Sequence, residues 1–150
     1  MHVNCHTYII GEHGDSEVAA WSITNIAGMS MKSFFEHYGK CTDEDLQAMY
    51  SEVKNSAYEI IQKKGATYYA IAAAVARIVE CISGGENSVL TISSVLNGEY
   101  GIEDISLSVP TQVSGYGVER ILDVPFNEIE LQGLRNSAKT LKDSLKSIGF

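Results

Sequence analysis

Positive charge is scarce in this 150-residue chain, which carries 11 lysines and arginines against 19 aspartates and glutamates. The resulting net charge of -8 argues against a nucleic-acid groove, because backbone phosphates need a positively charged surface. No secretory signal opens the sequence, and no apolar run reaches the length that spans a membrane. The composition therefore predicts a globular protein that binds neither nucleic acid nor membrane.

Cysteines are also few, and their spacing suits neither disulfides nor a metal. The chain has three of them, with no Cys-x-x-Cys pair and no close cysteine–histidine spacing: Cys5, Cys41 and Cys81. This pattern favours reduced thiols in a cytoplasmic protein. The four histidines form no metal-binding pattern either, and they are His2, His6, His13 and His37. We therefore expect no bound metal ion.

A glycine-rich dinucleotide loop is missing as well. No Gly-x-Gly-x-x-Gly follows a predicted strand, so nothing in this sequence reads as a dinucleotide-binding half. The length is that of one domain, and it suffices to bury a core without disulfides or metal. Repeats, low-complexity tracts and linkers are absent from the sequence. We expect a single domain over residues 1–150.

Two long helices are expected in the middle of the sequence. Thr42 is a good N-cap with Asp45 at the capping-box position, and Gly65 supplies a left-handed stop. The apolar residues between them recur every three or four positions and form one stripe: Leu46, Tyr50, Val53, Ala57 and Ile60. The second helix, residues 67–83, is apolar nearly all round, which predicts a buried position in the middle of the domain.

Strands flank these helices. A buried strand is expected at residues 5–10, and a second extended piece at 18–26 leads to a short helix at 31–38. Further strands are expected at residues 90–96, 105–113 and 118–124. The last helix begins after Asn127, with Glu130 at the capping-box position, and its apolar stripe comprises Leu134, Ala138, Leu141, Leu145 and Ile148. Helices and mainly antiparallel strands grouped in runs predict an α+β fold.

The most informative segment is Gly-Glu-His-Gly-Asp-Ser at residues 11–16. It follows an apolar run, so it places the His13 imidazole in a loop at the end of a strand. Imidazole exchanges a proton near neutral pH, but the spacing alone fits either a working histidine or a turn histidine. We interpret Asp15 as a local turn acceptor. Metal-dependent hydrolysis at His13 and Asp15 lacks a second credible ligand.

Two longer strings carry a family resemblance. His6-Thr-Tyr-Ile-Ile-Gly-Glu-His-Gly-Asp-Ser-Glu-Val-Ala-Ala-Trp21 closely resembles the active-site histidine segment of bacterial L-lactate dehydrogenases and related 2-hydroxyacid dehydrogenases. Tyr58-Glu-Ile-Ile-Gln-Lys-Lys-Gly-Ala-Thr-Tyr-Tyr-Ala-Ile-Ala72 is similar to the second landmark of that family. The resemblance covers essentially the whole chain. It implies the C-terminal half of such an enzyme, with the N-terminal NAD-binding Rossmann domain outside this sequence.

The resemblance also implies roles for individual residues. His13 matches the catalytic histidine, which gives a proton to the 2-oxo oxygen of the substrate as a hydride arrives from NADH. Thr67 matches a threonine that borders substrate and nicotinamide, although it is also a natural helix N-cap. Ile71 matches an apolar wall against the nicotinamide ring, with core packing as the alternative. The family's orienting aspartate and two substrate-binding arginines are expected outside this sequence.

Two further matches concern regulation. His6 matches a position that some bacterial members use for fructose 1,6-bisphosphate at a subunit interface, although one histidine is a weak phosphate site compared with an arginine fork. Tyr58 matches a tyrosine that is expected to be phosphorylated in this family. The alternative role of Tyr58 is packing beside the apolar stripe. The resemblance implies a homo-oligomer, a tetramer in the full enzyme.

The leading hypothesis is therefore the substrate-binding and catalytic half of an NAD-dependent L-2-hydroxyacid dehydrogenase, inactive by itself. Lactate and pyruvate are favoured as substrates, because malate dehydrogenases tend to differ around Glu12 and Ala66-Thr67. An L-2-hydroxyisocaproate or malate dehydrogenase is the alternative within the family. A non-catalytic anion-binding or oligomerisation module that uses His6 and His13 is the alternative from another class.

Overall fold

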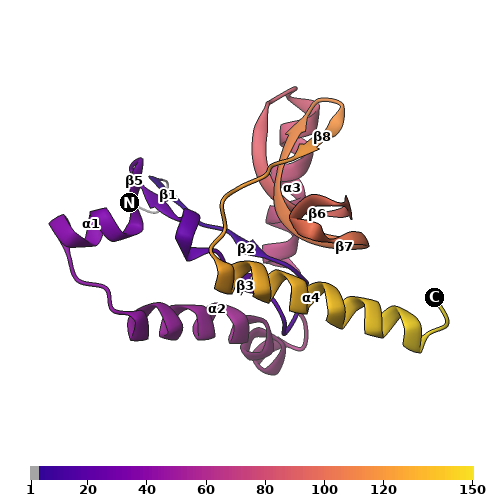
Figure 1. Ribbon diagram of the computed structural model, residues 1–150, viewed down its shortest axis with the longest axis horizontal. Helices are drawn as coiled ribbons and strands as arrows, with labels where there is room; N and C mark the ends of the chain where they lie inside the picture. Colours follow the sequence, from indigo (N-terminus) through magenta and orange to yellow (C-terminus); the bar gives the residue numbers. More distant parts are fainter. Residues whose placement is uncertain (1–3) are drawn as a thin grey trace. The chain divides into compact units, whose positions relative to one another are not determined.

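The computed structural model, drawn in Figure 1, describes residues 4–150. These residues divide into two compact units. The first unit contains residues 4–40, Thr91–Thr111 and Ile121–Phe150, and the second contains Cys41–Leu90 and Gln112–Arg120. Four helices and antiparallel strand pairs confirm the expected α+β class. His2 lies outside the described residues.

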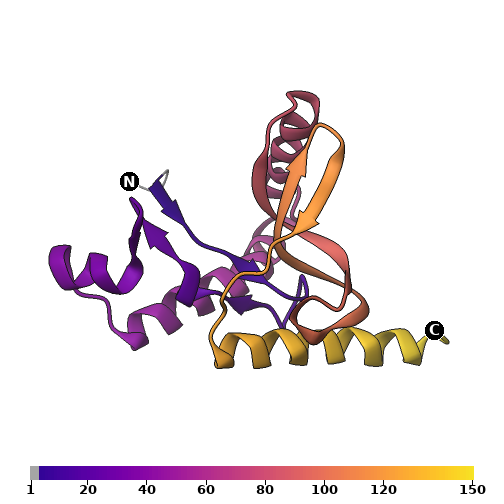
Figure 2. The same ribbon diagram turned by 45° about the horizontal axis from the view of Figure 1, so that its top comes forward.

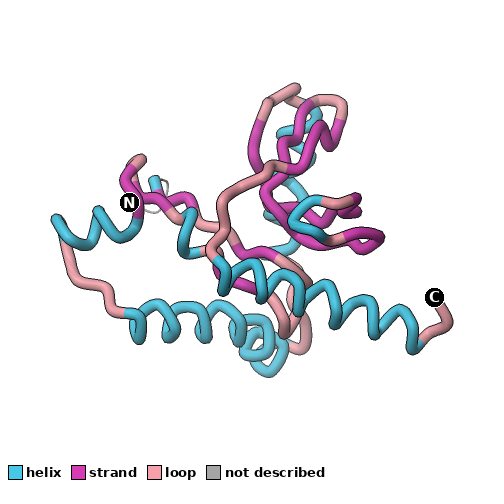
Figure 3. The backbone as a smooth tube through the Cα atoms, in the orientation of Figure 1, coloured by secondary structure: helices cyan, strands magenta, loops and turns pink. Residues whose placement is uncertain are grey.

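Residues 4–40 contain short strands rather than long ones (Figure 3). They are β1 (Cys5–His6), β2 (Ile9–Ile10), β3 (Val18–Ala19), β4 (Asn25–Ile26) and β5 (Met29–Ser30), followed by α1 (Met31–Tyr38) as predicted. The expected strand at residues 5–10 is divided because the chain changes partner: β1 pairs with β4, whereas β2 pairs with β3. The prediction that this whole segment is buried is wrong, since Cys5 and His6 are exposed.

The extended piece expected at residues 18–26 is interrupted by a short 3-10 helix, η2 (Trp21–Ile23). This turn presents Ser22 to the buried carboxylate of Glu130, which accepts hydrogen bonds from the Ser22 backbone N–H at 2.8 Å and from the Ser22 hydroxyl. The Thr24 hydroxyl donates back to the Ala20 carbonyl at 3.1 Å. The interruption therefore connects the short strands to the last helix.

That helix, α4 (Glu128–Ser147), begins with the predicted capping box of Asn127 and Glu130. Its side chains Leu134 and Ala138 are buried against the core of the first unit, together with Ile10, Ala20, Leu96, Ile102, Ile105, Leu107, Val109 and Phe126. Leu141 packs partly buried against the same core. The stripe leaves the core after it, since Leu145 is 38% exposed and Ile148 follows the end of the helix. Only the first part of the predicted stripe is buried.

The second unit contains α2 (Asp43–Lys64) and α3 (Tyr69–Ser83). The predicted capping box of Thr42 and Asp45 is present, and Gly65 ends α2 with φ +83°. The prediction that α3 is a buried helix is wrong, because Cys81 is its only buried residue. An all-round apolar helix is buried only where other elements cover it, and α2 has no buried residue either.

The strands β6 (Ser88–Asn97), β7 (Glu103–Ser114) and β8 (Gly117–Ile121) form one sheet in that order, close to the predicted ranges (Figure 2). The predicted turn after β6 is closed by two backbone hydrogen bonds, from Gly98 to Ile102 at 2.9 Å and from Gly101 to Gly98 at 3.0 Å. Within residues 4–150, no helix combines the length and apolar character needed to cross a membrane.

Candidate active site

The His13 loop lies in the first unit, between β2 and β3. Its first residue, Gly11, forms an antiparallel bridge with Ser108 of β7, with N–H to carbonyl distances of 2.8 and 2.9 Å. Gly11 has φ +96°, and a Cβ built there would lie 2.7 Å from Ser137 Oγ. Both the backbone angle and the close approach of α4 therefore require glycine at this position.

Four further contacts hold the loop. The Glu12 backbone N–H donates to the hydroxyl of Ser137, a fully buried residue of α4. The Ser16 hydroxyl donates to the Glu12 carboxylate, and Ser16 Oγ lies 3.1 Å from Ser137 Oγ. The Glu17 N–H donates to the Gly14 carbonyl at 3.2 Å, which closes the turn. Glu12 thus folds back over its own loop rather than pointing outward along a strand.

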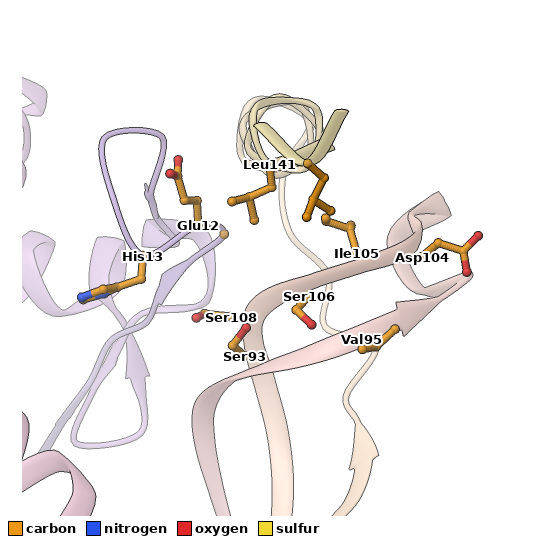
Figure 4. A pocket seen from close by; sticks show the side chains of 11 residues that line it. Glu12, His13, Ser93, Val95, Asp104, Ile105, Ser106, Ser108 and Leu141 are labelled. Atoms are coloured by element: carbon orange, nitrogen blue, oxygen red, sulfur yellow. The ribbon is translucent and has the colours of Figure 1, made fainter. Parts of the chain in front are cut away.

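His13 itself is exposed. It borders a hollow of about 730 Å³ in the first unit, lined by serines and apolar side chains of β6 and β7, by the acidic residues Glu12 and Asp104, and by leucines of α4. In Figure 4 the imidazole extends away from the hydroxyls of Ser93 and Ser108. The backbone contacts described above, rather than a partner of the ring, fix the position of this residue.

Thr67 and Ile71 belong to the second unit. Thr67 is partly buried in the turn between α2 and α3, but the interpretation of this residue as an N-cap is wrong, because α3 begins two residues later and has no side-chain cap. The turn is held by Lys64, whose Nζ lies 4.2 Å from the ring centre of Tyr68 and 4.6 Å from that of Tyr69. Ile71 is 52% exposed, so it is not a core residue.

The two candidates for regulation are both accessible. His6 lies on β1, one of the two edge strands of the sheet β1-β4-β5, and it is exposed opposite Asn25. Tyr58 on α2 is 58% exposed, so it is not packed into a core. Among the residues that the structure describes, no three histidine, cysteine or acidic side chains gather as a metal site.

Ser137 and Ser108 were not among the predicted site residues. Ser108 acts through its backbone, which leaves no mark in the sequence. The sequence did contain one indication of Ser137. It lies three residues after Leu134 and next to Ala138, so its hydroxyl interrupts the apolar stripe of α4. A buried polar group at such a place needs a hydrogen-bond partner, and Glu12 supplies it.

Comparison with solved structures places this geometry in a known class. The chain superposes on a minor L-lactate dehydrogenase from Enterococcus mundtii with a TM-score of 0.91 and 43% identity, covering 97% of this chain and 46% of that one. It superposes on a lactate dehydrogenase from a Medee basin deep-sea metagenome library with a TM-score of 0.96 and 38% identity, covering 100% of this chain and 48% of that one. The fold is thus that of one domain of a dehydrogenase.

The sequence comparisons agree. Residues 2–149 match the lactate/malate dehydrogenase, alpha/beta C-terminal domain, and the chain belongs to this family. It is 56% identical over 146 residues to the L-lactate dehydrogenase of Acetivibrio thermocellus, covering 97% of this chain and 46% of that protein. The chain therefore spans about half the length of the curated relatives it matches.

Proposed function

We propose that this domain supplies His13 as the proton donor and acceptor in the NAD-dependent interconversion of pyruvate and L-lactate. The observation that carries the proposal is an exposed imidazole on a loop whose backbone is fixed to both β7 and α4. Membership in the lactate/malate dehydrogenase family supports it, together with the similarity to L-lactate dehydrogenases. A fixed loop matters because proton transfer requires the donor within hydrogen-bond reach of the reacting oxygen.

The chemistry follows from the imidazole. In the direction of reduction, the protonated His13 ring donates its proton to the carbonyl oxygen of the 2-oxo acid, while the carbonyl carbon accepts a hydride. The products are the hydroxyl group and a neutral imidazole, which takes the hydroxyl proton in the reverse direction. Bound NADH supplies the hydride, and NAD⁺ accepts it in the reverse reaction. Histidine suits both directions because its proton exchanges near neutral pH.

We assign the other contacts with substrate and cofactor to Thr67 and Ile71. Ile71 is half exposed in the first turn of α3, where its side chain offers an apolar surface that fits a nicotinamide ring. The Thr67 side chain makes no capping hydrogen bond to α3, which leaves its hydroxyl available to a substrate. Both assignments are supported by the resemblance of residues 58–72 to the family landmark.

The remaining assignments concern the whole protein. We propose a cytoplasmic homo-oligomer in which a Rossmann domain binds NAD, and no turnover by the 150-residue chain alone. Fructose 1,6-bisphosphate is the proposed ligand of His6, whose exposure on an edge strand is compatible with an anion, and Tyr58 is a proposed phosphorylation site. Malate and L-2-hydroxyisocaproate are the competing substrates.

A chimeric enzyme tests the proposal. The N-terminal half of the Acetivibrio thermocellus L-lactate dehydrogenase is joined to this chain, since the two C-terminal domains are 56% identical. We expect NADH-dependent reduction of pyruvate that exceeds reduction of oxaloacetate and 2-oxoisocaproate. A folded chimera that binds NADH and reduces none of the three would contradict the proposal. A preference for oxaloacetate would indicate malate rather than lactate as the hydroxy acid.

A further inference from the structure

We propose that Ser137 of α4 is a positioning residue for His13. This inference rests on the proposed function of His13 as the proton carrier. Ser137 is fully buried, and its hydroxyl accepts a hydrogen bond from the backbone N–H of Glu12, the residue directly before His13. The two residues are 125 positions apart in the sequence, so this bond ties the C-terminal helix to the loop that carries the imidazole.

The bond completes an attachment on two sides. The Gly11 carbonyl accepts from the Ser108 N–H of β7 at 2.9 Å, and the next amide, that of Glu12, donates to Ser137. The side chain of Ser137 also touches the backbone closely, since a Cβ at Gly11 would lie 2.7 Å from its Oγ and 3.1 Å from its Cβ. Consecutive backbone groups before His13 are therefore held from different elements, which limits how far the imidazole can move.

The position of Ser137 on α4 favours this role over simple packing. It faces the same side as Leu134 and Ala138, where an apolar side chain would satisfy burial without the cost of desolvating a hydroxyl. Both hydrogen-bond partners of the Ser137 hydroxyl belong to the His13 loop: the Glu12 backbone N–H, and Ser16 Oγ at 3.1 Å. Removing it leaves the partly buried Glu12 N–H without its partner and frees the loop one residue before His13.

The first test measures amide exchange in the 150-residue chain. We expect the wild-type Glu12 amide to exchange more slowly than the Gly14 amide of the same loop, and Ser137→Ala to abolish this protection. Ser144→Ala is the matched control, because the Ser144 hydroxyl donates only within α4, to the Thr140 carbonyl at 3.0 Å. Wild-type Glu12 and Gly14 amides that exchange equally fast overturn the proposal, whether or not the variant folds.

The second test measures catalysis in the chimeric enzyme, well below its melting temperature. We expect Ser137→Ala to lower kcat for pyruvate about tenfold with an unchanged KM for NADH, because small displacements of a reacting group slow the chemical step. Ser137→Cys, which keeps a weak acceptor of similar shape, should restore part of the rate. A purely structural role would lower the melting temperature and leave kcat unchanged, which would overturn the proposal.

The two proposals fail in different ways. If His13→Gln removes activity while Ser137→Ala behaves like Ser144→Ala, the positioning role is wrong and the function of His13 stands. If His13→Gln is as active as the wild type, the proposed function is wrong, and the positioning role falls with it regardless of the exchange data.

Discussion

The core of the first unit and the two helices of the second unit differ in how deeply their apolar residues are buried. In the first unit Ile10, Leu107 and Leu134 are completely buried. In the second unit α2 and α3 contain one buried residue between them, and Val75 and Val79 on α3 are 53% and 55% exposed. A complete capping box nevertheless begins a long helix in each unit, α4 in the first and α2 in the second. Local signals thus define where a helix lies, whereas burial depends on what covers it.

The proposed site residues differ in the same way. The His13 loop is held by Ser108 and Ser137, which are distant in the sequence. The turn that carries Thr67 is held by its neighbours Lys64, Tyr68 and Tyr69. Substitutions at Ser108 or Ser137 should therefore affect the His13 loop although they lie far from it in the sequence. The turn at Thr67 should respond mainly to substitutions of its sequence neighbours.

The largest expected effect is on stability in the core. Leu134→Ala in the first unit should lower the free energy of unfolding by about 2–5 kcal/mol, because it leaves a cavity beside fully buried neighbours. Val75→Ala removes a half-exposed side chain and should cost about 0.5 kcal/mol or less. Urea unfolding of the 150-residue chain measures both. Equal losses would remove the contrast between the units.

Glycine substitutions sharpen the comparison. Gly65→Ala places a side chain at φ +83° with nothing within 4 Å, so it should cost about 1–2 kcal/mol from backbone strain alone. Gly11→Ala adds a 2.7 Å contact with Ser137 Oγ to a similar strain, and it should cost more. The same unfolding experiment compares them. If Gly11→Ala is the milder of the two, the close packing of α4 on the loop is contradicted.

Thr67→Val separates catalysis from stability in the second unit. Because Thr67 does not cap α3, the substitution should leave the melting temperature unchanged. The loss of the hydroxyl should lower kcat/KM for pyruvate in the chimeric enzyme about tenfold, the cost of roughly one hydrogen bond. Steady-state kinetics and thermal unfolding of the same preparations provide both readouts. A lower melting temperature with unchanged kinetics would remove Thr67 from the site.

The smallest effect concerns the N-terminus of α2. Hydrogen bonds from the Thr42 backbone and side chain lower the pKa of Asp45 below its ordinary value. A lowered pKa gives stabilisation that is complete above the unfolded-state pKa of about 4 and is lost as the pH falls through the folded-state pKa. Asp45→Asn should therefore weaken the acid dependence of the melting temperature slightly, whereas Glu52→Gln, farther along α2, should not. Identical acid profiles for wild type and Asp45→Asn would contradict this account.

Much of the architecture could be predicted, because caps and turns are local. The sequence motifs at Thr42, Gly65 and Asn127 correspond to the observed ends of α2 and the start of α4. The division of residues 5–10 between two sheets could not be predicted, since it depends on which strand each part meets. The exposure of α3 and the bond between Glu12 and Ser137 depend on tertiary contacts, and periodicity does not encode them.

For the site, residue chemistry and family resemblance supplied different parts. The glycines around His13 predicted a loop histidine, but only the resemblance favours a proton carrier over a turn residue. The anchoring by Ser108 and Ser137 appears only when β7 and α4 are in place. Sequence reasoning therefore supplied the proposal for His13 and missed the residues that hold its loop.

A single-turnover measurement tests the central claim most directly. The chimeric enzyme with bound NADH is mixed with pyruvate, and NADH oxidation is followed for wild type, His13→Gln and His37→Gln. His37 is the matched control, because it is exposed on α1 and its Nδ1 lies 2.8 Å from the Ser33 carbonyl of the same helix. We expect His13→Gln to slow the reaction at least about a hundredfold, as loss of a general acid does, and His37→Gln to leave it unchanged. Equal rates for the two variants would contradict the assignment of proton transfer to His13.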